Sequence, residues 1–272
     1  MELATKMNRR DLLFLVDTLL PWRTDRDQEA ERIGADEPLL KTMLEDGRLF
    51  ERLVTDENIL LQVSPWLFFT VLLRRTWHDL AREAFTVEQR GRRKITLFDT
   101  DRVVKLLEQE AVRDYLATLL ASFTRIESVT VLVETKPGAW RAYHTNELNV
   151  PGMIRYSQTL DKAFRFAPYK RLGDACLFLT GLFPEHINNQ HRYPASGRVR
   201  PRSKSQIVQT LEDYESHGRR FYRLAAEHPQ ARLEVLDAVL STLSDNFILA
   251  RKPLTFMADR YLQFGKHSLF DL

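Results

Sequence analysis

Cysteine is nearly absent from this chain of 272 residues, in which Cys176 stands alone. A single cysteine cannot form an intrachain disulfide, and it excludes a zinc site built from several cysteines. A reducing environment is the simplest setting for such a chain, so the sequence predicts a cytoplasmic protein. Glycine and proline are also few, at 10 and 11 residues, which argues against collagen-like repeats and linker-rich arrays.

Long hydrophobic runs are absent as well. The most apolar stretch, residues 59–73, contains Gln62, Ser64 and Pro65 and is closed by two arginines. It is shorter than the roughly 20 residues that a helix needs to cross a bilayer. We therefore expect a buried helix there and no membrane span.

Familiar catalytic templates are missing. The chain holds no Gly-x-Gly-x-x-Gly, no Walker loop, no Gly-x-Ser-x-Gly and no His-Glu-x-x-His. Glu185, His186 and His191 cluster in the sequence, but their spacing matches no familiar zinc pattern. The sequence thus assigns no catalytic residue, no metal ligand and no cofactor. It favours a protein that is not an enzyme without deciding the question.

What the sequence does contain is helical periodicity. The chain is 44% hydrophobic and 28% charged, as in ordinary globular proteins. We predict a mainly α fold, a compact bundle of many helices. One helix should start near Asn8 and stop before Pro21, and a second segment, 36–54, should break at Gly47. Ser64 followed by Pro65 is a typical helix start, with a capping hydroxyl and proline in the first turn.

One stretch has the period of a strand instead. Val129, Val131 and Val133 alternate with other side chains, and Lys136-Pro137-Gly138 is suited to a tight turn. This pattern predicts a small β-hairpin near residues 129–144. We expect a single domain, 1–272, with an N-terminal lobe 1–128 and a C-terminal lobe 150–272 joined by the hairpin. Helices are predicted in the second lobe at 152–165, 168–183, 204–228, 230–250 and 252–264.

Charge is unevenly spread along the chain. Residues 23–57 hold eleven acids against six bases, and residues 150–272 hold eighteen bases against twelve acids. From His186 to Leu211 there is no acid, and Pro201 keeps part of this stretch extended. Alternating guanidinium groups on an extended chain can follow phosphates or an acidic protein surface, but they can also simply be solvated. The bases concerned are Arg192, Arg198, Arg200, Arg202 and Lys204.

A second basic stretch spans residues 90–94, where we expect a turn between two helices. Read alone, four bases in five residues are a weak signal and are often just a solvated turn. They could also join the first stretch in one contact surface, although the sequence does not show that the two are close. The bases are Arg90, Arg92, Arg93 and Lys94.

The helix predicted near 171–183 is apolar on more than one face and yet contains Asp174. A buried carboxylate needs a cationic partner, for which Arg74, Arg75 and Arg251 are candidates, or it marks a functional pocket. Such a pocket would be formed by Asp174, Glu185, His186 and Tyr222. Cys176 on the same helix is expected to be inert packing. The glycines at 173, 181 and 218 indicate close approach of helices.

These features lead to two main hypotheses of different classes. The first is a non-enzymatic regulatory or adaptor protein that binds an acidic partner, protein or nucleic acid, through residues 192–204 with help from 90–94. The second is a helical small-ligand sensor or enzyme with its pocket near Asp174. A third alternative is a subunit of a larger assembly or a homo-oligomer, joined through the acidic region 23–57.

Overall fold

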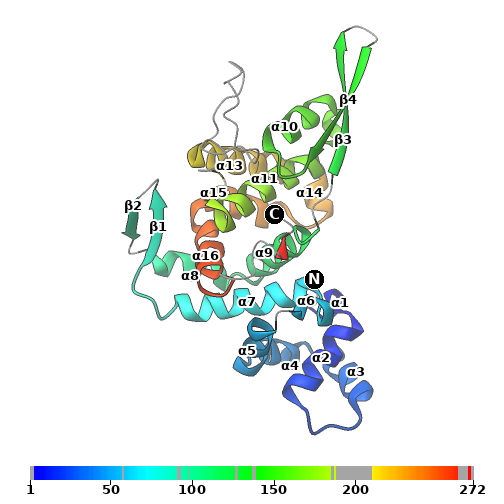
Figure 1. The fold of residues 1–272 in the computed structure, drawn as a ribbon, viewed down its shortest axis with the longest axis vertical. Coiled ribbons are helices and arrows are strands. Elements are labelled where there is room, and N and C mark those ends of the chain that lie inside the picture. The colour runs from blue at the N-terminus through cyan, green and yellow to red at the C-terminus, as the bar shows by residue number, and fades with distance from the viewer. Residues whose placement is uncertain are drawn as a thin grey trace. The chain divides into compact units, whose positions relative to one another are not determined.

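The computed structural model describes residues 3–56, 58–90, 93–97, 99–125, 128–136, 139–184, 187, 210–262 and 269–270. The protein is mainly helical, as the sequence predicts (Figure 1). It divides into two compact units, whose bounds differ from those of the expected lobes. The first unit comprises Met1–Phe85, Phe98–Thr124 and Phe256–Leu272, and the second comprises Thr86–Leu97 and Arg125–Thr255.

The first unit begins with a series of short helices. Asn8 caps α2 (Arg9–Leu19): its side chain accepts a 2.9 Å hydrogen bond from the backbone of Asp11, and the side chain of Asp11 accepts one from the backbone of Asn8. The expected break at Gly47 is confirmed, because Asp46 caps a new helix there. These helices are α1 (Leu3–Lys6), α2 (Arg9–Leu19), α3 (Arg26–Ala35), α4 (Glu37–Leu44), α5 (Gly47–Thr55) and α6 (Ile59–Gln62).

The central element of the first unit is α7 (Pro65–Leu80). The predicted start is confirmed, since Oγ of Ser64 accepts a 3.1 Å hydrogen bond from the backbone of Leu67. Residues 66–73 are all buried. The helix packs against α8 (Thr100–Glu108) and α9 (Glu110–Ser122).

Within its described residues, the second unit contains two antiparallel strand pairs. One consists of β3 (Ser128–Lys136) and β4 (Ala139–Asn146), and β4 contacts the helix that follows it, α10 (Val150–Thr159) (Figure 1). The other consists of β1 (Thr86–Arg90) and β2 (Arg93–Leu97). The stretch 90–94 lies between two helices, as expected, but its described residues, Arg90, Arg93 and Lys94, belong to strands and not to a turn. The β-branched residues on both sides, such as Thr86 and Ile95, favour the extended chain.

The other described helices of the second unit begin and end at residues that differ from those predicted. The predicted helix 230–250 is divided at Val235, where the backbone is left-handed with a φ of 55°, and again at Asn246. The helices are α10 (Val150–Thr159), the 3-10 turn η1 (Lys162–Phe164), α11 (Phe166–Leu182), α13 (Leu211–Ala226), α14 (Pro229–Leu233), α15 (Asp237–Asp245) and α16 (Phe247–Arg260), whose last turn belongs to the first unit.

Candidate functional site

Positive charge is concentrated in the second unit. That unit carries twenty-three Lys and Arg against fourteen Asp and Glu, a net charge of +9, and the first unit carries seventeen against twenty-three, a net charge of −6. Both basic stretches, 90–94 and 192–204, belong to the second unit. The uneven charge along the chain is therefore also a difference between compact units.

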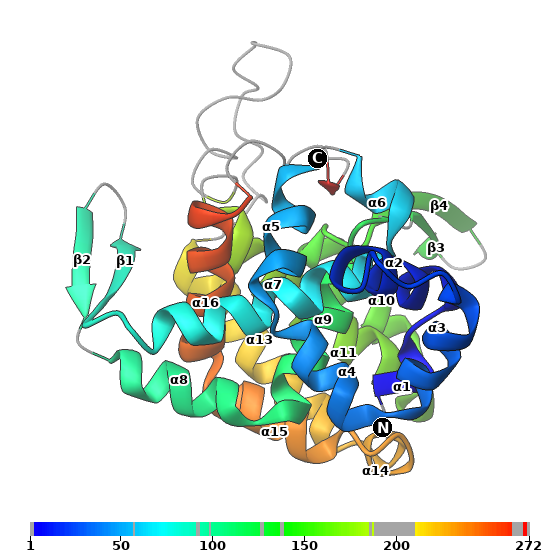
Figure 2. The ribbon, with the colours of Figure 1, turned by 90° about the horizontal axis from the view of Figure 1, so that it is seen from below.

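The stretch 90–94 lies where β1 and β2 approach their connection. Arg90 is opposite Arg93 in the ladder, and Arg92 lies outside the described residues. At the start of β1, Nζ of the buried Lys252 on α16 donates a 3.1 Å hydrogen bond to Oγ1 of Thr86. This bond attaches the base of the two-stranded ribbon, drawn in Figure 2, to a helix of its own unit.

The five bases predicted as the main contact, Arg192, Arg198, Arg200, Arg202 and Lys204, all lie outside the described residues. The stretch that contains them joins α11 to α13. The structure therefore describes the two helices that this stretch connects, but not the stretch itself.

These two helices pack closely through glycine, as the sequence indicates. A Cβ on Gly218 of α13 would lie 2.2 Å from the ring of Phe247 and 3.1 Å from Cβ of Cys176 on α11. A Cβ on Gly173 of α11 would lie 2.6 Å from the ring of Tyr222 on α13. The helices lie side by side in both ribbon views (Figures 1 and 2). There is no room for a side chain at either position, because Phe247 on α16 fills the space beside Gly218 and Tyr222 on α13 fills the space beside Gly173.

Asp174 connects the two helices inside this contact. Its side chain is fully buried, and Oδ1 accepts a 2.9 Å hydrogen bond from the hydroxyl of Tyr222. Oδ2 accepts a 2.8 Å hydrogen bond from Nζ of Lys170, one turn earlier on α11. A cation at this spacing is a usual partner for a helical carboxylate, so sequence reasoning could have found it.

The arginines that the sequence suggests as partners of Asp174 have other partners. Arg251 on α16 donates a 2.5 Å hydrogen bond to Glu215 on α13 and so joins these two helices. The other two arginines are in the first unit, where Arg74 pairs with Glu45 and Arg75 pairs with Asp79.

The predicted pocket near Asp174 is described only in part, because Glu185 and His186 lie outside the described residues. The two described members, Asp174 and Tyr222, are bonded directly to each other and have no exposed surface. Burial, with a smaller contribution from the charge of Asp174, raises the pKa of the Cys176 thiol. The thiol is therefore protonated at neutral pH, which makes it a poor nucleophile.

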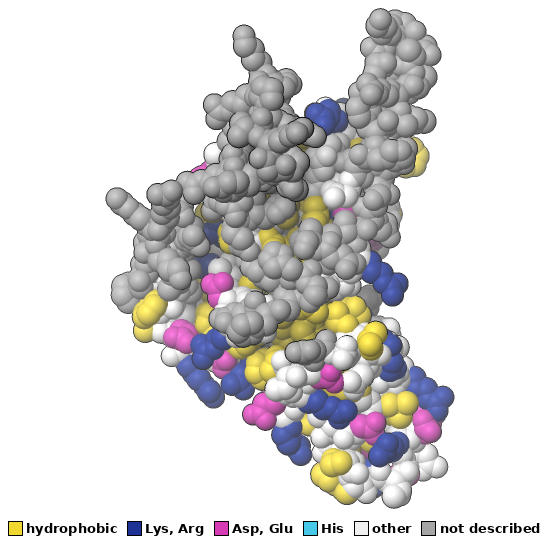
Figure 3. Space-filling model, in the orientation of Figure 1, with side chains coloured by type: hydrophobic (Ala, Val, Ile, Leu, Met, Phe, Trp, Pro, Cys, Tyr) yellow, Lys and Arg dark blue, Asp and Glu magenta, His cyan; other side chains and the backbone are white. Residues whose placement is uncertain are grey.

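A cleft of about 290 Å³ lies in the first unit, at a place that sequence reasoning did not single out. It opens between the turn that joins α4 to α5 and the C-terminal half of α7. Its signal in the sequence is a set of polar residues at helical spacing, Arg75, His78, Asp79 and Arg82, all of which face the cleft. Figure 3 shows basic side chains beside acidic ones near this end of α7.

Asp79 is the most buried polar residue of the cleft. It accepts a 2.6 Å hydrogen bond from the hydroxyl of Tyr261 and one of 3.2 Å from Nε of Arg75. Burial, followed by the bond to Asp79, raises the pKa of Tyr261. The phenol thus remains a neutral donor, and the side chain of Arg75 is held in place.

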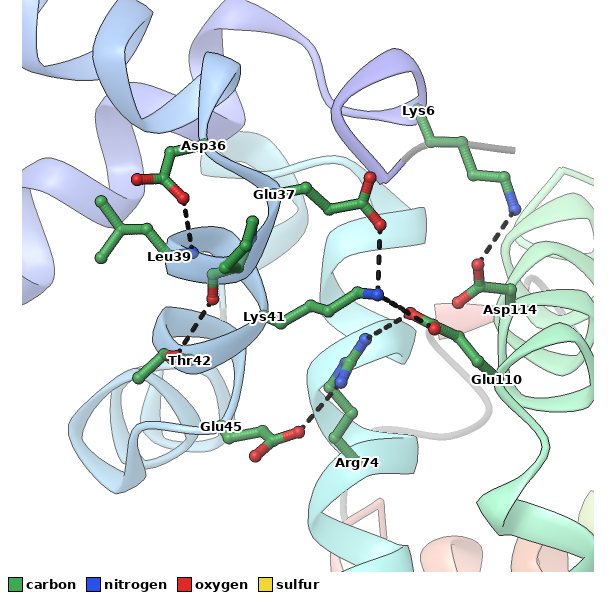
Figure 4. A network of polar contacts seen from close by, with 11 residues as sticks. Lys6, Asp36, Glu37, Leu39, Lys41, Thr42, Glu45, Arg74, Glu110 and Asp114 are labelled. Atoms are coloured by element: carbon green, nitrogen blue, oxygen red, sulfur yellow. Dashed lines mark hydrogen bonds and ion pairs between the residues drawn. The ribbon is translucent and has the colours of Figure 1, made fainter.

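Glu45 connects the cleft to a network of ion pairs within the first unit (Figure 4). Its Oε1 accepts a 3.0 Å hydrogen bond from the buried Arg74, whose other terminal nitrogen lies 3.8 Å from Glu110. Lys41 lies 3.0 Å from Glu110 and 3.1 Å from Glu37. This network joins α4 to α7 and α9. Within it, the carboxylate of Glu45 is held by its hydrogen bond from Arg74.

None of the described helices combines the length and the apolar character that crossing a membrane requires. No family model matches the chain, and neither a curated protein nor a solved structure matches it.

Proposed function

We propose that the chain is a non-enzymatic regulatory or adaptor protein that binds an acidic partner, protein or nucleic acid, through the basic stretches of its second unit. The observation that supports this most strongly is that 90–94 and 192–204 both belong to the unit of net charge +9. The summed field of such a unit attracts an acidic surface and speeds its association. The single cysteine supports a reducing compartment, the cytoplasm, as the setting.

The helices at the ends of the stretch 192–204 also support the proposal. Binding residues are often carried by loops that a rigid scaffold positions. Here the scaffold is the pair α11 and α13, held by glycine packing and by the buried hydrogen bond between Tyr222 and Asp174. A separate anchor, the bond from Lys252 to Thr86, holds the ribbon that carries 90–94.

The test measures how the full chain binds a labelled single-stranded oligonucleotide and a labelled polyglutamate at several salt concentrations. Replacing Arg198, Arg200 and Arg202 together by alanine should weaken binding of whichever probe is the better partner. For the oligonucleotide, loss of three phosphate contacts should also reduce the slope of log K against log salt by about 2. A preference for one probe identifies the class of partner.

A matched control removes the same charge elsewhere in the second unit. Arg155 on α10 and Arg219 and Arg220 on α13 are exposed, and their side chains have no partner among the described residues. Replacing these three by alanine should change binding much less than the first triple variant. If both variants lose binding equally, overall charge rather than the stretch 192–204 is responsible, and the assignment of the contact is wrong.

A further inference from the structure

We infer that the cleft of the first unit binds a small organic anion, whose charged group contacts Arg75 and Arg82 and whose apolar part lies on Phe50. This inference is independent of the acidic-partner proposal, because it concerns the other unit and uses neither basic stretch.

Arg75 is positioned to receive an anion. Its Nε lies 3.1 Å from Oδ1 of Asp79, and its guanidinium carbon lies 5.0 Å from the centre of the Phe50 ring. Among the described residues, no hydrogen-bond partner is found for its two terminal nitrogens. The planar end of a guanidinium can donate two parallel hydrogen bonds to a carboxylate or a phosphate. Asp79 thus orients Arg75 through one edge and leaves the donors at its end available.

Two further nitrogen groups border the cleft on the same side of α7. Arg82 is exposed, and its side chain has no ion pair within the described part of the chain. Nε2 of His78 lies 3.7 Å from Oε2 of Glu45, which is too long for a hydrogen bond. With Arg75, these residues form a row at intervals of three and four residues, so one anion could contact more than one of them.

The acidic residues of the cleft, by contrast, are already engaged. Glu45 is bonded to Arg74 at 3.0 Å. Asp46 accepts hydrogen bonds from the backbone and the side chain of Arg48, and this side chain lowers the pKa of Asp46. Asp79 is held by Arg75 and Tyr261. The groups left for a ligand are therefore cationic or neutral donors, which favours an anion over an amine.

The floor and the size of the cleft restrict the rest of the ligand. Leu44, Phe50 and Val71 supply apolar surface. A Cβ on Gly47 would meet no atom within 4 Å, so the cleft is open at this residue. Its volume of about 290 Å³ is near the lower limit for small-molecule pockets. A ring or short aliphatic chain with one carboxylate or phosphate is the class of ligand that fits.

The first experiment titrates the full chain with benzoate, phenyl phosphate and benzylamine, followed by ligand-observed nuclear magnetic resonance. Benzylamine is the matched control, because it carries the same ring with the opposite charge. We expect both anions to bind and the amine not to bind. If neither anion binds, or if benzylamine binds as well as benzoate, the inference is wrong.

Three variants locate the site. Arg82→Ala should weaken benzoate binding about ten-fold, the effect of losing one charge-assisted hydrogen bond. Gly47→Leu should weaken binding, because it adds a large side chain at a residue that lines the cleft. Arg102→Ala on α8 removes an exposed charge of the same unit, away from the cleft lining, and should leave binding unchanged. Unchanged binding by Arg82→Ala and Gly47→Leu, with the fold checked by circular dichroism, would overturn the assignment.

One more variant separates this inference from the proposed function. The triple alanine variant at Arg198, Arg200 and Arg202 should bind benzoate as tightly as the parent chain does. Loss of polyanion binding with benzoate binding retained would support both proposals. Loss of benzoate binding in this variant would show that the small anion binds elsewhere and would contradict the cleft.

Discussion

The hydroxyl of Tyr222 donates a 2.9 Å hydrogen bond to Oδ1 of Asp174, and both side chains are completely excluded from solvent. The two residues are 48 positions apart in the sequence and lie on α13 and α11. Their bond joins the two helices between which the stretch 192–204 runs. The sequence leaves open a functional role for Asp174. In the structure, this carboxylate accepts a buried hydrogen bond that joins two helices.

Tyr222→Phe should lower the free energy of unfolding by about 1.5–3 kcal/mol, because it removes a hydrogen bond to a buried charged group. Tyr156→Phe on α10 is the control, since the hydroxyl of Tyr156 has no partner among the described residues. Urea denaturation of both variants measures the difference. Equal stability of Tyr222→Phe and the parent chain would show that the bond contributes nothing.

Two Gly→Ala substitutions should have opposite signs. At Gly218 the new methyl would lie 2.2 Å from the ring of the buried Phe247, so we expect a loss of about 1–3 kcal/mol in spite of the better helix propensity. At Gly47 it would meet nothing within 4 Å, so we expect a gain of up to about 0.5–1 kcal/mol. Thermal denaturation tests both, and a stabilising Gly218→Ala would contradict the close packing of α13 against Phe247.

The helical class and several helix ends could be predicted because their causes are local. Ser64 with Pro65, Asn8, and the break at Gly47 depend on hydrogen bonds to the nearest few residues. The ribbon at 86–97 could not be predicted as easily, because its strands are short and its four bases dominate the pattern. The β-propensity of five residues alone is a weak indication of a strand.

The candidate sites were harder to predict because they depend on contacts between distant residues. Tyr261 and Asp79 are 182 positions apart, and nothing near either residue in the sequence indicates their hydrogen bond. The cleft likewise brings together residues that are far apart in the sequence, such as Glu45 and Asp79. By contrast, Lys170 as the partner of Asp174 follows from helical spacing, because the two residues are four positions apart on one helix.

Val235 ends α14 in a backbone conformation that glycine normally adopts. Its φ is 55°, its side chain is 83% exposed, and the backbone of Leu236 donates a 2.8 Å hydrogen bond to the carbonyl of Ala231, as in a Schellman cap. Val235→Gly should therefore raise the free energy of unfolding by about 1 kcal/mol. Val235→Ala keeps the Cβ and should therefore raise the free energy of unfolding less than Val235→Gly does. A less stable glycine variant, measured in urea, would show that this conformation is not strained.

Tyr214 should make stability depend on pH in the alkaline range. Burial raises the pKa of Tyr214 to about 12, and the nearby Cys176 adds to this. Its unfolded pKa is about 10, so the stability that the neutral phenol contributes is fully present below pH ~10 and is lost between about 10 and 12. The parent chain should lose more stability between pH 9 and 11.5 than Tyr214→Phe. Parallel losses in the two proteins would contradict this assignment.

The most direct test of the central proposal is the binding of acidic probes to the unmodified chain. Fluorescence anisotropy should show that labelled polyglutamate or single-stranded oligonucleotide binds, and that binding weakens steeply between about 50 and 200 mM salt, because counterions compete for the basic stretches. A labelled polylysine should not bind under the same conditions. Failure of both acidic probes to bind at the lower salt concentration would contradict an acidic-partner function for the second unit.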